Sequence, residues 1–338
     1  MRTFLVRRLL AVIPVIIGVI VFTFVLMRLL PGDPAAYLAS TPGMGPEQIE
    51  KIRKDLGIDK SVPEQLWIYM TDLARGDLGK SIVTGRPVID DIAQRLPASL
   101  ELTIFALIAT LIIAIPLGIL GALWPNTILD HTVRVISALG GAIPAFVTGL
   151  LLVFVFFYLL GWAPEPVGRL DAFVSPPDTV TGFYLIDSAI AHDFEQFAGS
   201  FKQLLLPAGT MVLFALPPIT RMTRASMLEV LSSDAIRTAR AMGLPRRKIL
   251  ISYALRAAAI PIVTTVGIIV SFMLGANVLV EKVFAWPGIG SYALEGLLAS
   301  DYSPVQGFVL LMSIIFVSVN FCVDLLYAAI DPRVRIAR

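Results

Sequence analysis

Charged residues are scarce in this sequence, and their scarcity indicates the class of protein. Asp, Glu, Lys and Arg together make up 15% of the 338 residues, whereas 57% of the residues are hydrophobic. A soluble domain carries about 25% charged residues. The composition therefore describes an integral membrane protein.

Cysteine, histidine and the common catalytic motifs are also missing or nearly so. The single cysteine, Cys322, excludes a disulfide framework and a cysteine metal cluster. His131 and His192 lie far apart without a neighbouring ligand pair, so we expect no metal site. The sequence contains no H-E-x-x-H, G-x-S-x-G or Walker A motif and no paired intramembrane aspartates. We therefore expect no catalytic residue, no cofactor in this chain and no ATP hydrolysis by the chain itself.

Six charge-free runs are long enough to cross a bilayer, which takes about 20 apolar residues per helix. The runs cover residues 9–27, 102–123, 135–163, 204–220, 257–280 and 302–323. They predict an all-α integral membrane protein with six transmembrane helices. The third run has room for an interfacial turn, and Gly140–Gly141 followed by Pro144 is its predicted flexible point.

Arginine and lysine orient these spans, because cytoplasmic loops carry an excess of both. Arginines occur in both terminal segments, at Arg134 and most densely in residues 221–256, whereas the opposite loops are rich in acids. We therefore expect both termini in the cytoplasm. The predicted organisation is residues 1–30 as N-terminus and first helix, 31–99 as an extracytoplasmic region, 100–330 as the core and 331–338 as a cytoplasmic tail.

Two loops of this organisation are long enough to form structure of their own. In the region after the first helix, we expect short helices at residues 47–56 and 63–74. Within the core, residues 161–203 form an acidic outer loop, which we also expect to be structured, and residues 221–256 form a basic cytoplasmic loop.

The cytoplasmic loop contains the pattern of one short capped helix. Ser232, Ser233 and Asp234 are N-cap candidates. Gly243 suits a left-handed C-cap, and Pro245 prevents the helix from continuing. Four residues at i, i+3, i+4 and i+7 would share one small face, and these are Ala235, Thr238, Ala239 and Met242. Such a face suits a shallow groove on a partner, although a plain topology signal beside a membrane span would also explain the basic residues.

These residues carry a resemblance to a known family. The stretch TARAMGLPRRKILISYALRAAAIP resembles the cytoplasmic loop signature of ABC-transporter permease subunits, with Thr238–Ala239–Arg240 as the triplet and Gly243 as the glycine. The triplet lacks the usual glutamate and position 256 lacks a proline, and both departures resemble the peptide-importer branch. PGDP at 31–34, GDLGKS at 76–81, FAWPGIG at 284–290 and DLLYAAIDPRVR at 324–335 are similar to further motifs of that branch.

The resemblance implies the permease fold of a type I ABC importer and a set of partners. These are a related second permease, two cytosolic ATPases that use ATP and magnesium, and an extracytoplasmic substrate-binding protein, all at the inner membrane of a bacterium. It implies that the short helix couples the chain to an ATPase through Asp234, Ala235, Thr238, Ala239, Met242, Gly243 and Leu244.

The resemblance also assigns an outer site and leaves the substrate open. Trp286, Pro287 and Gly288 would form an outer gate or a binding-protein contact, with simple anchoring at the membrane interface as the equal alternative. The expected function is ATP-driven import of dipeptides or similar small peptides. Longer peptides, glutathione, nickel chelates and haem remain open as substrates, and no substrate-binding residue can be named.

An ion-coupled secondary transporter is the alternative to an ATP-driven importer. Such transporters usually keep ionisable residues inside the membrane. In this sequence Arg28, Glu101 and Asp324 lie only at the ends of the predicted spans, which favours the importer.

Overall fold

The computed structural model describes residues 2–29, 47, 54, 57, 59–171 and 173–330, with side chains described from residue 12 onward except those of residues 136, 138 and 139. The described residues are helical apart from turns, loops and one isolated antiparallel bridge between Lys80 and Pro87. The all-α prediction is confirmed. The predicted helix at 47–56, the PGDP motif at 31–34 and the tail at 331–338 lie outside the continuously described residues.

Within the described residues, five continuous helices are long and apolar enough to cross a membrane. They are α1 (Arg2–Leu29), α5 (Val88–Leu123), α9 (Phe194–Leu231), the helix Arg246–Val283 and α14 (Tyr302–Ile330). The fourth of these contains α11 (Arg246–Lys248), the π-helical segment η2 (Ile249–Leu255) and α12 (Arg256–Val283).

The third of the six predicted spans is a bent pair of helices. α6 (Ile128–Ala142) is followed by α7 (Ala145–Leu152) and the π-helical segment η1 (Val153–Leu159), and the two halves make an angle of 103°. The bend lies at Ile143–Pro144, since Ile143 has an extended backbone (φ −104°, ψ 132°) and Pro144 has no N–H to continue the helix. The bend therefore lies beside the predicted flexible point.

Gly140 sits where α6 crosses α9. A Cβ added to it would lie 2.9 Å from the Leu213 carbonyl oxygen. Only glycine permits this close approach of the two backbones. The glycine therefore serves helix packing just before the bend.

Two helices begin earlier than the sequence predicted. α5 starts at Val88, so residues 88–99 are helical. α9 starts at Phe194, so the outer loop ends at Asp193, whose carboxylate caps the helix by accepting the backbone N–H groups of Glu195 and Gln196. The helices are longer than the runs because a charge-free run detects only the apolar middle of a helix, whereas its hydrogen bonds continue through polar turns. The region boundaries at 99 and 203 remain predictions.

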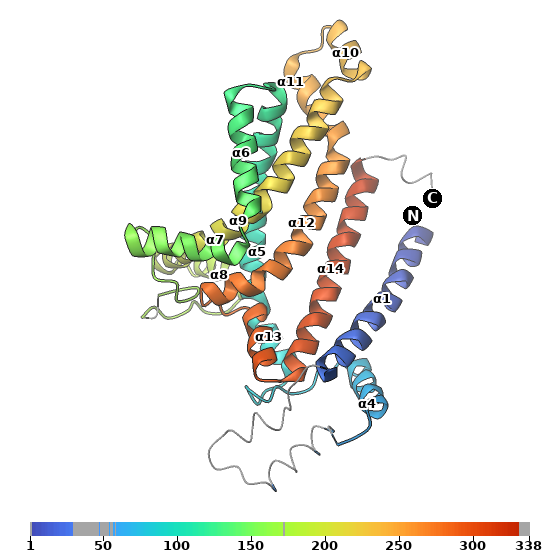
Figure 1. The fold of residues 1–338 in the computed structure, drawn as a ribbon, viewed down its shortest axis with the longest axis vertical. Coiled ribbons are helices and arrows are strands. Elements are labelled where there is room, and N and C mark those ends of the chain that lie inside the picture. Colours follow the sequence, from blue (N-terminus) through green and yellow to red (C-terminus); the bar gives the residue numbers. More distant parts are fainter. Residues whose placement is uncertain are drawn as a thin grey trace. The chain divides into compact units, whose positions relative to one another are not determined.

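The described chain divides into two compact units. The first contains the described residues of 98–286 and 318–330, and the second contains those of 2–97 and 287–317. In the first unit, α6, α9 and α12 lie side by side, and α7 runs across their direction (Figure 1).

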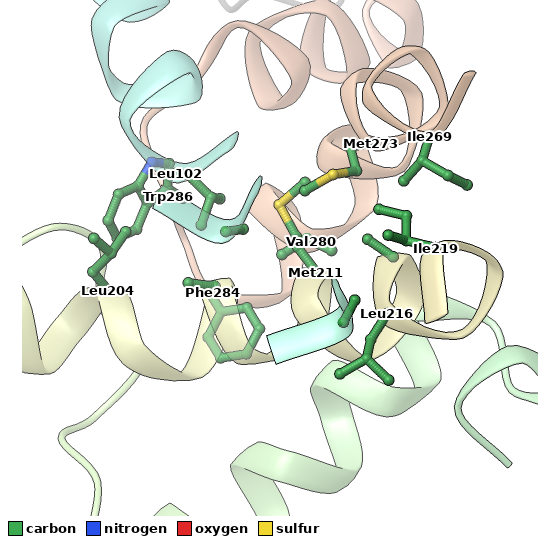
Figure 2. Close-up of a cluster of buried hydrophobic side chains, with 14 of the residues drawn as sticks. Leu102, Leu204, Met211, Leu216, Ile219, Ile269, Met273, Val280, Phe284 and Trp286 are labelled. Atoms are coloured by element: carbon green, nitrogen blue, oxygen red, sulfur yellow. The ribbon is translucent and has the colours of Figure 1, made fainter. Parts of the chain in front are cut away.

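The main core of the first unit joins α5, α9 and α12. Leu102, Leu204, Met211 and Met273 are buried there (Figure 2). Thr210 and Thr220, on α9, are also fully buried. Tight burial of apolar side chains on three helices makes this core the rigid part of the unit.

The second unit packs α4 (Val62–Ala74) beside the end of α1. The rings of Phe24 and Tyr69 stack with their centroids 5.7 Å apart, and Arg28 donates a 2.8 Å hydrogen bond to Gln65. α4 confirms the helix predicted at 63–74. Burial raises the pKa of Tyr69 to about 12, although nearby Arg28 partly offsets that effect.

The GDLGKS motif leads into a loop of the second unit that surrounds one carboxylate. Oδ2 of Asp301 accepts hydrogen bonds from the Ser81 hydroxyl at 2.7 Å and from the N–H groups of Ile82 at 2.7 Å and Val83 at 3.2 Å. Burial raises the pKa of Asp301, and these donors partly offset the rise. The motif therefore ties the segment before α5 to the segment before α14.

Candidate coupling site

The predicted cytoplasmic helix is present as α10 (Asp234–Ala241). It begins three residues after α9 ends, and Ser233 occupies its N-cap position in extended conformation. The Ser233 hydroxyl does not cap α10, because it donates to the Val230 carbonyl at 2.7 Å. Asp234 lies in the first turn, where a carboxylate complements the helix dipole, and pairs with Arg237 at 3.1 Å.

The C-terminal end of α10 forms a Schellman motif. The Leu244 N–H donates to the Ala239 carbonyl at 3.3 Å, and the Gly243 N–H donates to the Arg240 carbonyl at 3.0 Å. Gly243 has φ +73°, the left-handed conformation that the sequence predicted for it. Leu244 packs against the same apolar cluster as Ala239, which is the hydrophobic contact typical of this motif.

The face of α10 that packs on the protein differs from the face that sequence spacing suggested. Ile236 and Ala239 are 2% and 5% exposed, and they pack with Met227, Ile249 and Ala254. The prediction that Ala239 presents itself to a partner is therefore wrong for this structure. Ile236 is the most apolar residue of the helix, so it turns inward and takes Ala239, one turn later, with it.

The remaining residues of the predicted face stay on the surface. Ala235 and Thr238 are exposed, and Met242 is 73% exposed just beyond the last turn. Together with Asp234 they form an outward surface of α10, on which Arg237 and Arg240 are also exposed. Gly243 is exposed and Leu244 is partly buried. α10 and α11 lie next to each other at one end of the first unit (Figure 1).

A buried ion pair connects α6 with α9, the helix that leads to α10. The Arg224 guanidinium binds Asp130 through two nitrogens, with Nη2 2.8 Å from Oδ2. The Asn126 N–H donates to the same oxygen at 3.0 Å, and Arg134 lies 3.4 Å from it. Sequence reasoning used Arg134 and Arg224 only to orient the chain. It did not predict the ion pair, because 94 residues separate Asp130 from Arg224 and no local pattern joins them.

The outer site differs from its prediction. Trp286 is 2% exposed, and its indole N–H donates to the Ala98 carbonyl at 2.9 Å. Figure 2 shows it beside Leu102 and Leu204 in the core. The interpretation of Trp286 as an interface anchor is therefore wrong. Pro287 is exposed and Gly288 is buried, and a gate or binding-protein role for Trp286, Pro287 and Gly288 remains a prediction.

The outer loop is held to α5 by a buried ion pair. The Arg169 guanidinium binds Glu101, stacks on the Tyr184 ring with Cζ 3.5 Å from its centroid, and donates to the Gly182 carbonyl at 2.8 Å. The Leu185 N–H donates to Glu101 at 2.9 Å. The prediction that this loop is structured is consistent with these bonds.

Glu281 is a further buried carboxylate that sequence reasoning missed. It lies in the last turn of α12, is 0% exposed, and accepts from the Ser99 hydroxyl and from the Asn277 amide at 2.9 Å. The predicted span ended one residue before it. Among the described residues, no three His, Cys, Asp or Glu side chains are placed to hold a metal ion.

Comparisons with known proteins identify the family. The model described as "Binding-protein-dependent transport system inner membrane component" matches residues 114–336, and the model of its N-terminal part matches residues 1–103. Together the two matches cover nearly the whole chain.

Two curated relatives from Escherichia coli K12 are similar to this chain over nearly their full lengths. The probable D,D-dipeptide transport system permease protein DdpB is 45% identical over 95% of this chain and 94% of its own. The dipeptide transport system permease protein DppB is 39% identical over 99% of each chain.

A solved structure supports the fold. The inward-facing MetNI methionine ABC transporter superposes with a TM-score of 0.50 and 20% identity, over 69% of this chain and 93% of that one. The described helices thus have the fold of an ABC importer permease. The chain crosses a bacterial inner membrane several times. The chain belongs to the family of binding-protein-dependent transport system inner membrane components.

Proposed function

We propose that this chain is a pore-forming permease of a peptide importer and that α10 couples it to a separate ATPase. The observation that carries the proposal is the preordered surface of α10. The helix is anchored by Ile236 and Ala239 and closed by its Schellman motif, so its exposed side needs little ordering when a partner binds. Preorganisation of this kind favours association because less entropy is lost.

The exposed residues of α10 suit a groove. Ala235 and Thr238 are small enough to let another backbone approach, and Met242 adapts its shape to an apolar pocket. Asp234, at the start of the helix, can accept hydrogen bonds from a basic partner. We therefore assign the ATPase contact to Asp234, Ala235, Thr238 and Met242, and we give Ala239 and Gly243 the role of holding the helix in position.

Coupling requires that movement of α10 reach the membrane helices. α10 follows α9 directly, and the Asp130–Arg224 ion pair fastens α9 to α6. A displacement of α10 is thereby passed to both helices as one body. Moving the permease from 1:99 to 99:1 between two openings needs about 5.5 kcal/mol of differential binding, which the ATP-bound and ATP-free arrangements of the ATPases would supply.

The relatives support the partners and the substrate that we propose. Two ATPases that bind ATP and magnesium, a related second permease and an extracytoplasmic binding protein complete the importer. DdpB and DppB are named for dipeptide transport, and a relative from Pseudomonas aeruginosa, 38% identical, is a di/tripeptide permease. We propose dipeptides or similarly short peptides as the substrate.

The test places bulk on the exposed side of α10. Thr238→Trp occupies the exposed side, so the variant should insert normally, keep its thermal stability and lose both ATPase binding and peptide uptake. Arg237→Ala, on the same helix and already paired within it, is the matched control and should retain uptake. Wild-type uptake by the Thr238→Trp variant would show that this surface does not couple the chain to the ATPase.

A dependence on ion gradients would contradict the proposal in another way. Uptake into proteoliposomes should require ATP on the side of α10 and should persist when a protonophore collapses the proton gradient. Uptake that stops with the gradient and continues without ATP would favour a secondary transporter.

A further inference from the structure

The guanidinium of Arg28 is a cation at the end of a membrane-spanning helix. Arg28 lies in the last turn of α1, and its half-buried side chain reaches α4. Its Cζ stands 3.4 Å from the centroid of the Phe24 ring and 5.6 Å from that of the Tyr302 ring. Among the described residues, no carboxylate lies within 4 Å of this guanidinium.

The contacts within the protein use only part of this guanidinium. Nε donates to the Gln65 side-chain oxygen at 2.8 Å, and Nη1 donates to the Phe24 carbonyl at 3.3 Å. A guanidinium has five N–H groups in a rigid fork, so three of them have no acceptor within the described part of the chain. The fork holds Nη1 and Nη2 side by side, an arrangement that fits two oxygens of one phosphate.

A half-buried cation without an anion is unfavourable, because burial removes part of the water that stabilises its charge. The Phe24 ring offsets some of that loss through a cation–π contact. An anion bound to the three remaining N–H groups would offset more, since hydrogen bonds between charged groups are the strong ones. The position of Arg28 therefore favours an anionic ligand.

One face of α1 beside Arg28 is apolar and exposed. Four residues at i, i+3, i+4 and i+7 form it, with exposed fractions between 40% and 77%, and these are Phe22, Val25, Leu26 and Leu29. At 3.6 residues per turn, Arg28 lies at the border between this face and the buried face that contains Phe24. An acyl chain can therefore lie along the exposed face while its headgroup reaches Arg28.

The helix α4 flanks Arg28 on its other side. It packs against the C-terminal end of α1 through the stack of Tyr69 on Phe24 and the bond from Arg28 to Gln65 (Figure 1). On this helix the side chain of Trp67 is 75% exposed. Tryptophan concentrates where hydrocarbon meets water, because its ring is apolar and its N–H is polar. These features place α4 at the level of the lipid headgroups.

We propose that Arg28 binds the phosphate of a phospholipid whose acyl chains lie on the exposed face of α1 and whose headgroup borders Trp67. The lipid belongs to the leaflet at the C-terminal end of α1, which is the outer leaflet in the predicted orientation. A phospholipid matches both the cation and the apolar face beside it, whereas an acidic protein surface matches the cation alone. The inference does not depend on the coupling role of α10.

The experiment measures lipid binding to the purified, delipidated permease by native mass spectrometry. Phosphatidylglycerol and phosphatidylcholine should both bind, because both carry the phosphate, whereas dioleoylglycerol has the chains alone and should not stay bound. R28Q should bind both phospholipids about tenfold more weakly, equivalent to ~1.4 kcal/mol. R75Q is the matched control and should bind like the wild type, because Arg75 is exposed and follows the last turn of α4, about 15 Å from Gln65 at 1.5 Å per residue.

A second variant separates lipid binding from a change in folding. Phe22→Ala removes apolar surface from the exposed face of α1 and leaves every contact of Arg28 in place. The lipid-free variant should keep the unfolding temperature of the wild type. It should bind phosphatidylglycerol about threefold more weakly, because less apolar area is covered by the acyl chains.

Several results would overturn the inference. Wild-type affinity in R28Q would show that Arg28 does not hold the phosphate, and an equal loss in R75Q would show only a general attraction to basic residues. Binding of dioleoylglycerol as tight as that of phosphatidylglycerol would exclude recognition of the phosphate. Displacement of the lipid by an equal concentration of inorganic phosphate would show that the chains contribute nothing. If R28Q and the wild type differ in the isolated chain but not in the assembled transporter, a partner subunit covers Arg28 instead of lipid.

Discussion

Breaking the Asp130–Arg224 ion pair tests the idea that α6 and α9 move as one body. Asp130 is fully buried, whereas the Arg224 side chain is 21% exposed. The two single substitutions Arg224→Met and Asp130→Asn therefore leave different groups behind. The first leaves a buried carboxylate without its arginine, and the second leaves a guanidinium without its carboxylate but still able to reach water.

The magnitudes follow from what each variant leaves unpaired. Removing one partner of a buried ion pair typically costs about 3–5 kcal/mol. Arg224→Met should lie near 3 kcal/mol, because Arg134 at 3.4 Å and the Asn126 N–H at 3.0 Å still serve the carboxylate. Asp130→Asn should cost about 1–2 kcal/mol, since the stranded arginine is partly solvated.

The double variant completes the cycle. D130N/R224M leaves neither charge stranded, so it should be more stable than the sum of the single losses by about 2 kcal/mol. Denaturant titration of the purified permease in mixed micelles measures the three differences. Uptake should fall in both single variants while ATPase binding to α10 is retained.

Additive losses in this cycle would refute the reasoning. They would mean that the two side chains do not stabilise the fold through each other. Equal losses from the two single variants would also contradict it, because the burial of Asp130 and the partial exposure of Arg224 require an unequal effect.

Three further predictions concern other parts of the first unit. Trp286→Ala should destabilise the permease by about 3–5 kcal/mol, because it removes a fully buried ring and its bond to Ala98, and a loss below 1 kcal/mol in the same titration would place the ring outside the core. Gly118→Val should lower the unfolding temperature, because even a Cβ at this position would lie 2.6 Å from Thr223, and unchanged stability would contradict that packing. Burial alone would raise the pKa of Asp187, but its hydrogen bonds from the 180–182 segment outweigh burial and lower it, so the carboxylate contributes stability above about pH 4 that is lost as the pH falls. Asp187→Asn should therefore be less stable than the wild type at pH 7 and increasingly similar to it at acidic pH, and a gap that widens on acidification would show the opposite shift.

The turn signals of the cytoplasmic helix were read correctly from local chemistry. Gly243 adopts the left-handed conformation that only a residue without a Cβ takes easily. Pro245 lies in extended conformation before α11, so α10 does not continue through it. The six apolar runs were equally readable, because a bilayer imposes a length and a composition on each spanning helix.

Helix ends and orientations were not readable in this way. The start of α9 at Phe194 and the inward turn of Ile236 depend on hydrogen bonds and packing that a hydropathy run does not record. Trp286 illustrates the same limit, because an aromatic residue beside a span fits an interface and a core equally well until its indole N–H finds the Ala98 carbonyl.

What the amino-acid order settles here is what depends on neighbours within a few residues: the apolar middle of each spanning helix and the left-handed turn at Gly243 that ends α10. What required the folded chain is every relation between distant segments. The pairing of Asp130 with Arg224 and the burial of Ala239 arise from side chains brought together by packing, and packing depends on three-dimensional complementarity rather than on sequence spacing.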